Sequence, residues 1–218
     1  MAFLPPGPNS RLTRSERWTI VVFGVILFGL FGVDIALNYS PVKLSILFFI
    51  IFWFPLLVIH ETGHALMAAM LDWRVRRVVI GFGKSVKNFS VRQVPVELRM
   101  IPLEGFTQIA PRNARLPRLK SFLIYSAGPA AEFVFLLLLA VLIGLDELLS
   151  RTEHVGMIAA QAIAIAILMG LISNLVPHST ETQTGRSPND GLGMILSLSL
   201  TERQLDEMIE QADKNKPD

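Results

Sequence analysis

Four apolar blocks, each about as long as a membrane-spanning helix, constrain this chain more than any other feature. They cover approximately residues 18–37, 44–71, 122–145 and 155–176. A helix needs about 20 apolar residues to cross the hydrocarbon core of a bilayer. Of the 218 residues, 51% are hydrophobic, and the mean hydropathy is +0.49. We therefore predict an integral, multi-pass membrane protein that is mostly α-helical and has about four transmembrane helices.

The Lys and Arg residues alternate between many and few along the segments that flank these blocks. Three precede the first block, one follows it, eleven lie in residues 72–120, one follows the third block, and four follow the last. Segments rich in Lys and Arg stay in the cytoplasm. We therefore expect a cytoplasmic N-terminal segment (1–17), a single membrane core (18–200) and a cytoplasmic tail (201–218). The compact design suggests a bacterial inner membrane.

The net charge of +2 and the pI near 9.2 do not require a nucleic acid as partner. The basic residues flank the predicted spans, where anionic lipid headgroups account for them. We expect the lipid bilayer as a partner, and no nucleic acid; the sequence leaves the oligomeric state open. Because the chain has no Cys, any metal must be bound by His and carboxylate side chains.

The segment between the second and third blocks has a different pattern. Residues 74–110 contain short runs rich in Val, Ile and Phe, broken by Gly and Pro. These runs predict a small, membrane-associated antiparallel β-sheet. An open sheet edge cannot face lipid, so the sheet would lie at the membrane face or dip into the protein, as a cytoplasmic cap or as a platform that pairs with substrate. The expected strands are residues 75–80, 85–91, 94–101 and 106–109.

A His-Glu-Thr-Gly-His motif lies inside the second block, at residues 60–64. Residues four apart share one face of a helix, so His60 and His64 direct their imidazoles to one point, with Glu61 beside them. Ionisable side chains in a span are costly and are functional by default. Two imidazoles, a third protein ligand and a water form a zinc site. Zinc lowers the pKa of this water to about 7, and Glu61 can take its proton.

Three residues are candidates for the third ligand. Asp190 is the first, because it precedes the apolar run 192–200 and can start a helix that leans back toward the membrane. In the alternative interpretation, Asp190 is only a helix N-cap. His178, after the proline that ends the fourth block, is the second candidate, and Glu132 within the third block is the third. The predicted topology places both the histidine motif and Asp190 on the cytoplasmic side.

These elements, in this order, resemble the site-2 protease family of intramembrane zinc metalloproteases over about Ile46 to Met194. The resemblance implies that His60 and His64 are zinc ligands, that Glu61 is the catalytic glutamate, and that Asp190 is the third ligand. The other matching elements are Gly81-Phe82-Gly83, Ile101 to Phe106, Ala127-Gly128-Pro129, Asn174 to Pro177 and Asp190-Gly191.

Two departures from the family pattern matter. A polar segment, residues 178–189, separates the family's proline from its aspartate, so His178 remains an alternative ligand. Glu132 stands where many relatives have an uncharged polar residue.

Two positions that match the family pattern also have simpler interpretations. Asn174 would bind substrate or an oxyanion, or only satisfy backbone freed by the following proline. Gly128 and its small neighbours equally suit close packing of spans.

We therefore expect a zinc metalloendopeptidase that hydrolyses peptide bonds of membrane-embedded or membrane-adjacent proteins, with Zn²⁺ as cofactor and Glu61 as general base. The competing hypothesis is a non-proteolytic membrane protein. It would be a pseudoprotease that binds partner helices, or a metal or proton transporter that uses His60, His64, Glu132 and Asp190 as a relay. A pseudoenzyme need not keep Glu61, and a transporter usually has repeated halves.

Overall fold

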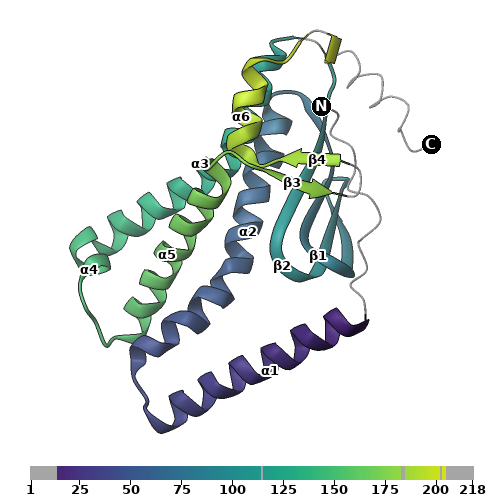
Figure 1. Cartoon of the computed structure of the whole chain (residues 1–218). Helices are drawn as coiled ribbons and strands as arrows, with labels where there is room; N and C mark the ends of the chain where they lie inside the picture. The colour runs from purple at the N-terminus through teal and green to yellow at the C-terminus, as the bar shows by residue number, and fades with distance from the viewer. Residues whose placement is uncertain (1–13, 114, 183–184, 202, 205–218) are drawn as a thin grey trace.

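The computed structural model describes residues 14–113, 115–182, 185–201 and 203–204 (Figure 1). Residues 1–13 of the expected N-terminal segment and most of the expected tail lie outside the described residues. The described chain is mostly helical, as predicted. Its helices are α1 (Arg14–Leu37), the 3-10 turn η1 (Pro41–Lys43), α2 (Leu44–Met70), α3 (Pro117–Ile143), α4 (Leu145–Leu149), α5 (Val155–Leu175) and α6 (Asp190–Leu198).

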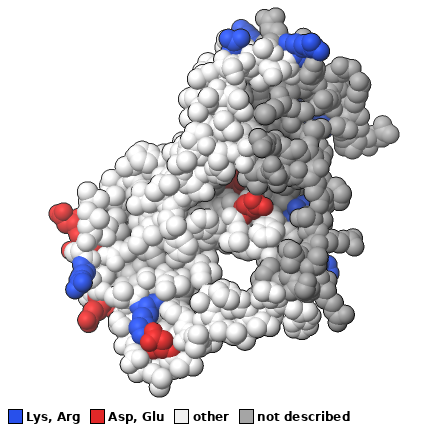
Figure 2. All heavy atoms as spheres, viewed as in Figure 1, with Lys and Arg blue, Asp and Glu red and all other residues white. Residues whose placement is uncertain are grey.

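Three helical segments are long and apolar enough to cross a membrane: Pro41–Met70, Pro117–Ile143 and Val155–Leu175. They match the second, third and fourth predicted spans. In α1 the apolar stretch found among the described residues, Val21–Leu37, is shorter, so the first span stays a prediction. Figure 2 shows a broad face over α2, α3 and α5 that is almost free of charged side chains, which gather near its ends. Such a surface suits an integral membrane protein.

Helix α3 begins at Pro117, earlier than the predicted start near residue 122. Proline favours the first helical turn, where its missing N–H is not needed. Leu116, just before it, has a left-handed backbone (φ 51°) that turns the chain into the helix. As a result, Arg118 lies in the first turn of α3, and its Nε donates a hydrogen bond to the carbonyl of Leu200 at 2.9 Å.

The segment that was expected to hold four short strands forms two long ones, so that the predicted number was wrong. Strand β1 (Trp73–Val91) pairs antiparallel with β2 (Val94–Pro111), which confirms the predicted antiparallel sheet. Gly81 and Gly83 have φ values of 92° and 87°, which glycine adopts readily, so β1 bends there and continues. Residues 78–80 pair with residues 105–107 and also with 96–98.

The polar segment before Asp190 is a small hairpin rather than an extended insertion. Strands β3 (Ser179–Thr182) and β4 (Gly185–Pro188) pair antiparallel. The two ends of the segment meet, because the backbone N–H of Asn189 donates to the carbonyl of His178 at 3.1 Å. The chain therefore returns to the end of α5 before α6 begins, and the added residues do not carry Asp190 away from the bundle.

Helix α2 lies between the other elements, with α3 and α5 on one side and the β1–β2 sheet on the other (Figure 1). One cluster of buried side chains joins α2 to α5 and contains Leu56, Ala166, Ile167 and Leu171. A second joins α2 to the sheet and α3 and contains Ala68, Trp73, Ile109 and Ile124. The histidine motif lies on α2 between Leu56 and Ala68, and therefore between these two clusters.

Helices α2 and α3 approach each other closely at Gly63. A Cβ atom added there would lie 2.5 Å from the backbone carbonyl oxygen of Ala127. The contacted oxygen belongs to the backbone of α3, so no flexible side chain can move aside to relieve this contact. Small residues permit such close helix packing in membranes, where apolar burial alone does not drive association.

We expect Gly63→Ala to push α2 and α3 apart and to lower the free energy of unfolding by about 1–3 kcal/mol, the usual cost of overpacking. Gly29→Ala in α1 is the matched control, because a Cβ added at Gly29 meets nothing within 4 Å. Thermal unfolding of both variants in detergent measures the effect. Equal unfolding midpoints for Gly63→Ala and wild type would contradict the proposed contact.

Candidate metal centre

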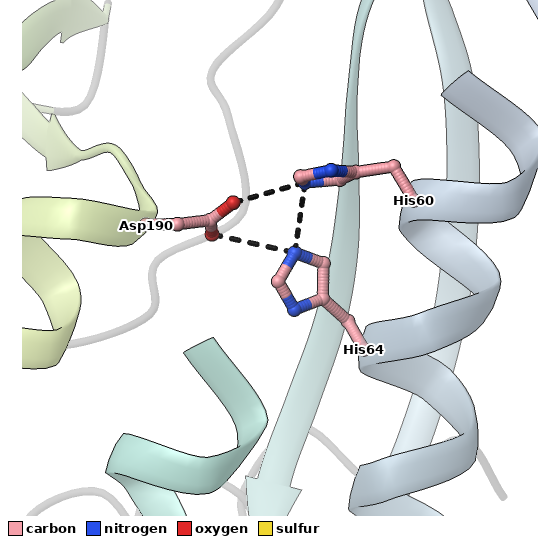
Figure 3. A group of neighbouring side chains, drawn as sticks. All are labelled: His60, His64 and Asp190. Atoms are coloured by element: carbon pink, nitrogen blue, oxygen red, sulfur yellow. Dashed lines mark hydrogen bonds and ion pairs between the residues drawn. The ribbon is translucent and has the colours of Figure 1, made fainter. Parts of the chain in front are cut away.

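His60 and His64 lie on consecutive turns of α2, as their spacing predicts, and are only 5% and 8% exposed. Their Nε2 atoms are 3.0 Å apart (Figure 3). Two imidazole nitrogens that face each other this closely need a proton or a cation between them. The pair is therefore placed so that it is able to bind a metal ion.

Asp190, the first residue of α6, lies beside both imidazoles. Its Oδ2 lies 2.9 Å from Nε2 of His60, and its Oδ1 lies 3.3 Å from Nε2 of His64. Ligands about 2.0–2.1 Å from a tetrahedral zinc ion would be about 3.3 Å from each other, so these distances fit zinc. Among the described residues, His60, His64 and Asp190 are the group that is able to hold a metal ion.

The charge of Asp190 suits this role. Burial raises the pKa of its carboxyl, but hydrogen bonds with His60 and His64 more than offset this effect and lower the pKa to about 2. The side chain is therefore an ionised carboxylate at neutral pH, the form that binds metals.

Asn189 determines where Asp190 lies, although sequence reasoning missed it. Asn189 is the N-cap of α6, and its Oδ1 accepts a hydrogen bond from the backbone N–H of Leu192 at 3.1 Å. Its Nδ2 donates to the carbonyls of Ser173, Asn174 and Val176 at 2.7–3.1 Å. One side chain thus ties the start of α6 to the end of α5. An Asn just before an apolar helix is a common cap signal and could have identified it.

This network changes the interpretation of Asn174. Pro177 has no N–H, so the carbonyl of Ser173, four residues earlier, loses its usual helical donor. Asn189 supplies the missing hydrogen bond to Ser173 at 3.1 Å. The simpler role considered for the Asn174 side chain was a hydrogen bond to backbone freed by Pro177. Asn189 makes this hydrogen bond instead. The N-cap role considered for Asp190 also belongs to Asn189.

His178, the alternative third ligand, lies apart from the two imidazoles. It is exposed, and its Nδ1 is 3.0 Å from the carbonyl oxygen of Val176 and 2.9 Å from Nδ2 of Asn189. It is not a member of the group that His60, His64 and Asp190 form. Its side-chain contacts are with Val176, whose carbonyl also accepts a hydrogen bond from Asn189, and with Asn189 itself.

Helix α3 contacts the other ring nitrogens of the two histidines. The carbonyl oxygen of Ile124 is 2.6 Å from Nδ1 of His64. Glu132, the remaining ligand candidate, has its Oε1 3.4 Å from Nδ1 of His60 and is not in the metal-binding group. The two nitrogens of an imidazole lie on opposite sides of the ring, so Glu132 faces away from the point where the Nε2 atoms meet Asp190.

Glu61 is 4% exposed and is held by the sheet. Thr107 of β2 donates a hydrogen bond to Oε2 of Glu61 at 2.7 Å, and its Oγ1 also lies 3.1 Å from the Glu61 carbonyl oxygen. Gly105 packs against the same carboxylate, since a Cβ added there would lie 2.8 Å from Oε1. Thr107 had no signal in the sequence, because its partner is far away along the chain.

Gly128 lets α3 pass directly over the two imidazoles. A Cβ added at Gly128 would lie 2.4 Å from Nε2 of His64 and 2.7 Å from Nε2 of His60. The small residue therefore serves the packing of spans, as one interpretation of the sequence predicted. It also leaves room at the point where the ligands converge.

Comparison with known proteins agrees with this geometry. A model of peptidase family M50 matches residues 48–212. Zinc metalloprotease RasP from Geobacillus kaustophilus is 34% identical over 35% of this chain and 18% of its own length. Protease RseP from Yersinia pestis is 32% identical over 50% of this chain and 27% of its own. Membrane metalloprotease ARASP from Arabidopsis thaliana is 31% identical over 37% of this chain and 21% of its own length. The matches thus span at most about a quarter of these relatives.

We expect Gly128→Ala to displace the imidazoles and weaken zinc binding. Overpacking of about 1–3 kcal/mol corresponds to about a 5- to 150-fold loss of zinc affinity if the imidazole rings bear the cost. Titration of zinc against a chelator measures this loss. Gly156→Ala, where a Cβ meets nothing within 4 Å, should bind zinc like wild type. Unchanged affinity in Gly128→Ala would show that the added methyl does not reach the ligands.

Proposed function

The chain belongs to peptidase family M50, the site-2 protease family that its sequence resembles, and we propose that it is an intramembrane zinc endopeptidase. Its substrates would be membrane-embedded or membrane-adjacent proteins, whose peptide bonds it hydrolyses. The observation that carries the proposal is the convergence of His60, His64 and Asp190 from α2 and α6. Family membership and this cluster together favour a protease over a membrane protein that merely contains histidines.

In the proposed centre, His60, His64 and Asp190 hold the metal. Zinc, when bound, polarises the scissile carbonyl and lowers the pKa of the attacking water. Glu61 is the general base that takes a proton from this water and passes it to the leaving amine. Thr107 holds Oε2 of Glu61 by a hydrogen bond, which fixes the orientation of the carboxylate and leaves Oε1 to accept the proton. His60, Glu61 and His64 are buried and Asp190 is half-buried, so their electrostatic interactions are strengthened by the partial exclusion of water.

Four spans with both termini in the cytoplasm would place this centre in the cytoplasmic half of the membrane. The alternation of Lys and Arg along the sequence supports this topology, and a bacterial inner membrane fits it. Helix α1 would be the fourth span. Figure 1 places it apart from α3 and α5, and its apolar side chains, such as Phe23 and Leu30, are exposed, as lipid contact requires.

The β1–β2 sheet would align the substrate. A peptide bond must leave a helical conformation to be cleaved, and an extended segment can add to the edge of a sheet through main-chain hydrogen bonds. Two contacts support this role. Thr107 joins β2 to Glu61, and Nε1 of Trp53 on α2 donates to the carbonyl of Leu103 at 3.3 Å. Asn174 would hydrogen-bond the substrate or the developing oxyanion.

Replacement of the general base tests the mechanism. We expect Glu61→Gln to keep its zinc and to lose at least about a hundredfold in cleavage rate, since a general base contributes about 10²–10⁴-fold. The assay compares membranes that contain each variant and identifies new peptide N-termini by mass spectrometry. Glu153→Gln, at an exposed acidic residue between α4 and α5, is the matched control and should cleave like wild type.

Two results would refute the proposal. Cleavage by Glu61→Gln at the wild-type rate would exclude Glu61 as the base. A zinc-loaded wild-type protein that yields no new N-termini, but carries zinc or protons across proteoliposomes, would establish the transporter hypothesis instead.

The third ligand has its own test. We expect Asp190→Ala to reduce zinc affinity by more than about a hundredfold, because loss of a direct ligand exceeds the effect of an outer one. His178→Ala should leave the affinity unchanged. Asp190→Asn repeats the test with the shape of the side chain retained. Chelator competition on the purified proteins measures all three, and a loss in His178→Ala alone would reassign the ligand.

A further inference from the structure

Glu132 is the one acidic residue of α3 and is almost fully buried, with 4% of its surface exposed. Its Oε1 lies 3.4 Å from Nδ1 of His60. Within the described part of the chain, its Oε2 and the His60 Nδ1 both lack a hydrogen-bond partner. Two adjacent buried residues that each have a polar atom without a hydrogen bond point to a functional contact between them.

The surroundings of Glu132 make a passive role unfavourable. Phe135 and Leu136, one turn further along α3, pack against the apolar cluster that contains Leu56 and Ile167. A carboxylate buried beside such side chains costs free energy unless it is paired. The ion pair described for Glu132 is the one with His60.

Helix α5 confines the carboxylate. A Cβ added at Gly170 would lie 3.3 Å from both carboxylate oxygens of Glu132. The bare backbone at Gly170 therefore makes room for the carboxylate, but leaves little space for it to turn away from His60. Helix α5 thus shapes the site without supplying a metal-binding side chain to the group of His60, His64 and Asp190.

The two histidines have matching environments. Each directs Nε2 toward Asp190 and presents Nδ1 to an oxygen of α3. For His64 this oxygen is the carbonyl of Ile124, and for His60 it belongs to Glu132. An acceptor at Nδ1 favours the tautomer with its proton on Nδ1 and leaves the lone pair of Nε2 for a metal.

We propose that Glu132 is a positioning residue, whose carboxylate accepts the Nδ1–H of His60 and holds this ring in the tautomer and orientation that bind zinc. The distance of 3.4 Å exceeds an ordinary hydrogen bond of about 2.9–3.0 Å. The proposed role therefore requires a small rotation of the Glu132 side chain toward His60. Glu132 acts through His60, because it lies on the opposite side of the ring from the ligand atoms. The inference rests on the proposed metal centre.

The test measures zinc affinity and metal-free stability separately in the full-length protein in detergent. Loss of the outer partner of a ligand histidine weakens metal binding by about 10–100-fold. We expect Glu132→Gln, which keeps a neutral acceptor, to lose about tenfold in zinc affinity. Glu132→Leu, which removes the acceptor, should lose about a hundredfold. In the metal-free state, Glu132→Gln should unfold near the wild-type temperature because it keeps an acceptor for the Nδ1–H of His60, whereas Glu132→Leu leaves this buried N–H unpaired and should unfold at a lower temperature.

Ser121→Ala is the matched control. Ser121 is a buried polar residue of α3, and its Oγ accepts a hydrogen bond from Ser197 at 2.9 Å, away from the metal-binding group. We expect this variant to lose stability and to keep wild-type zinc affinity. The opposite pattern in Glu132→Gln, with metal-free stability kept and zinc affinity lost, is one that a purely structural role cannot produce.

His60→Ala in the same assay separates the two levels of inference. Wild-type zinc affinity in His60→Ala would overturn the proposed metal centre itself. Reduced affinity in His60→Ala, with wild-type affinity in both Glu132 variants, would overturn the positioning role alone. If Glu132→Leu does not fold, Glu132→Gln decides, because it is nearly isosteric with the native side chain.

Discussion

The site depends on one constraint: polar groups buried among apolar helices must satisfy one another. Water cannot do this within the bundle, so each group needs a partner from the protein. His64 contacts the carbonyl of Ile124, Glu61 accepts from Thr107, and Asp190 contacts both imidazoles. These contacts join α2, α3, α6 and β2 around a single point. The same interactions that organise the metal centre therefore hold these elements in place.

Close packing is the second requirement, and glycines provide it. Lipid chains are as apolar as the helix surfaces, so apolar burial contributes little to helix association, and tight contacts matter more. The backbone of Gly63 meets Ala127, Gly128 lies over the imidazoles, and a Cβ at Gly191 would lie 2.2 Å from the carbonyl oxygen of Leu175. The contacts at Gly63 and Gly128 pack α2 against α3, and the contact at Gly191 packs α6 against the end of α5.

Local sequence patterns were less informative where the chain bends. Glycine and proline between runs of Val and Ile predicted four strands, but Gly81 and Gly83 bend β1 without ending it. A glycine at positive φ fits both a turn and a bent strand, and only the pairing partners distinguish them. Similarly, residues 178–189 gave no strand signal, yet residues 179–182 and 185–188 form the paired strands β3 and β4, which are stabilised by pairing rather than by apolar alternation.

The sequence by itself determined the three long apolar helices and the convergence of His60 and His64 on one helix face. Both follow from local quantities, the thickness of a bilayer and the helical period. Only the tertiary structure decided that Asp190, and not His178, lies beside the imidazoles, and that Thr107, Asn189 and Glu132 contact the site residues or position them. Most of these contacts join residues far apart in the chain, and the packing of α2, α3, α5 and the sheet determines which of them meet.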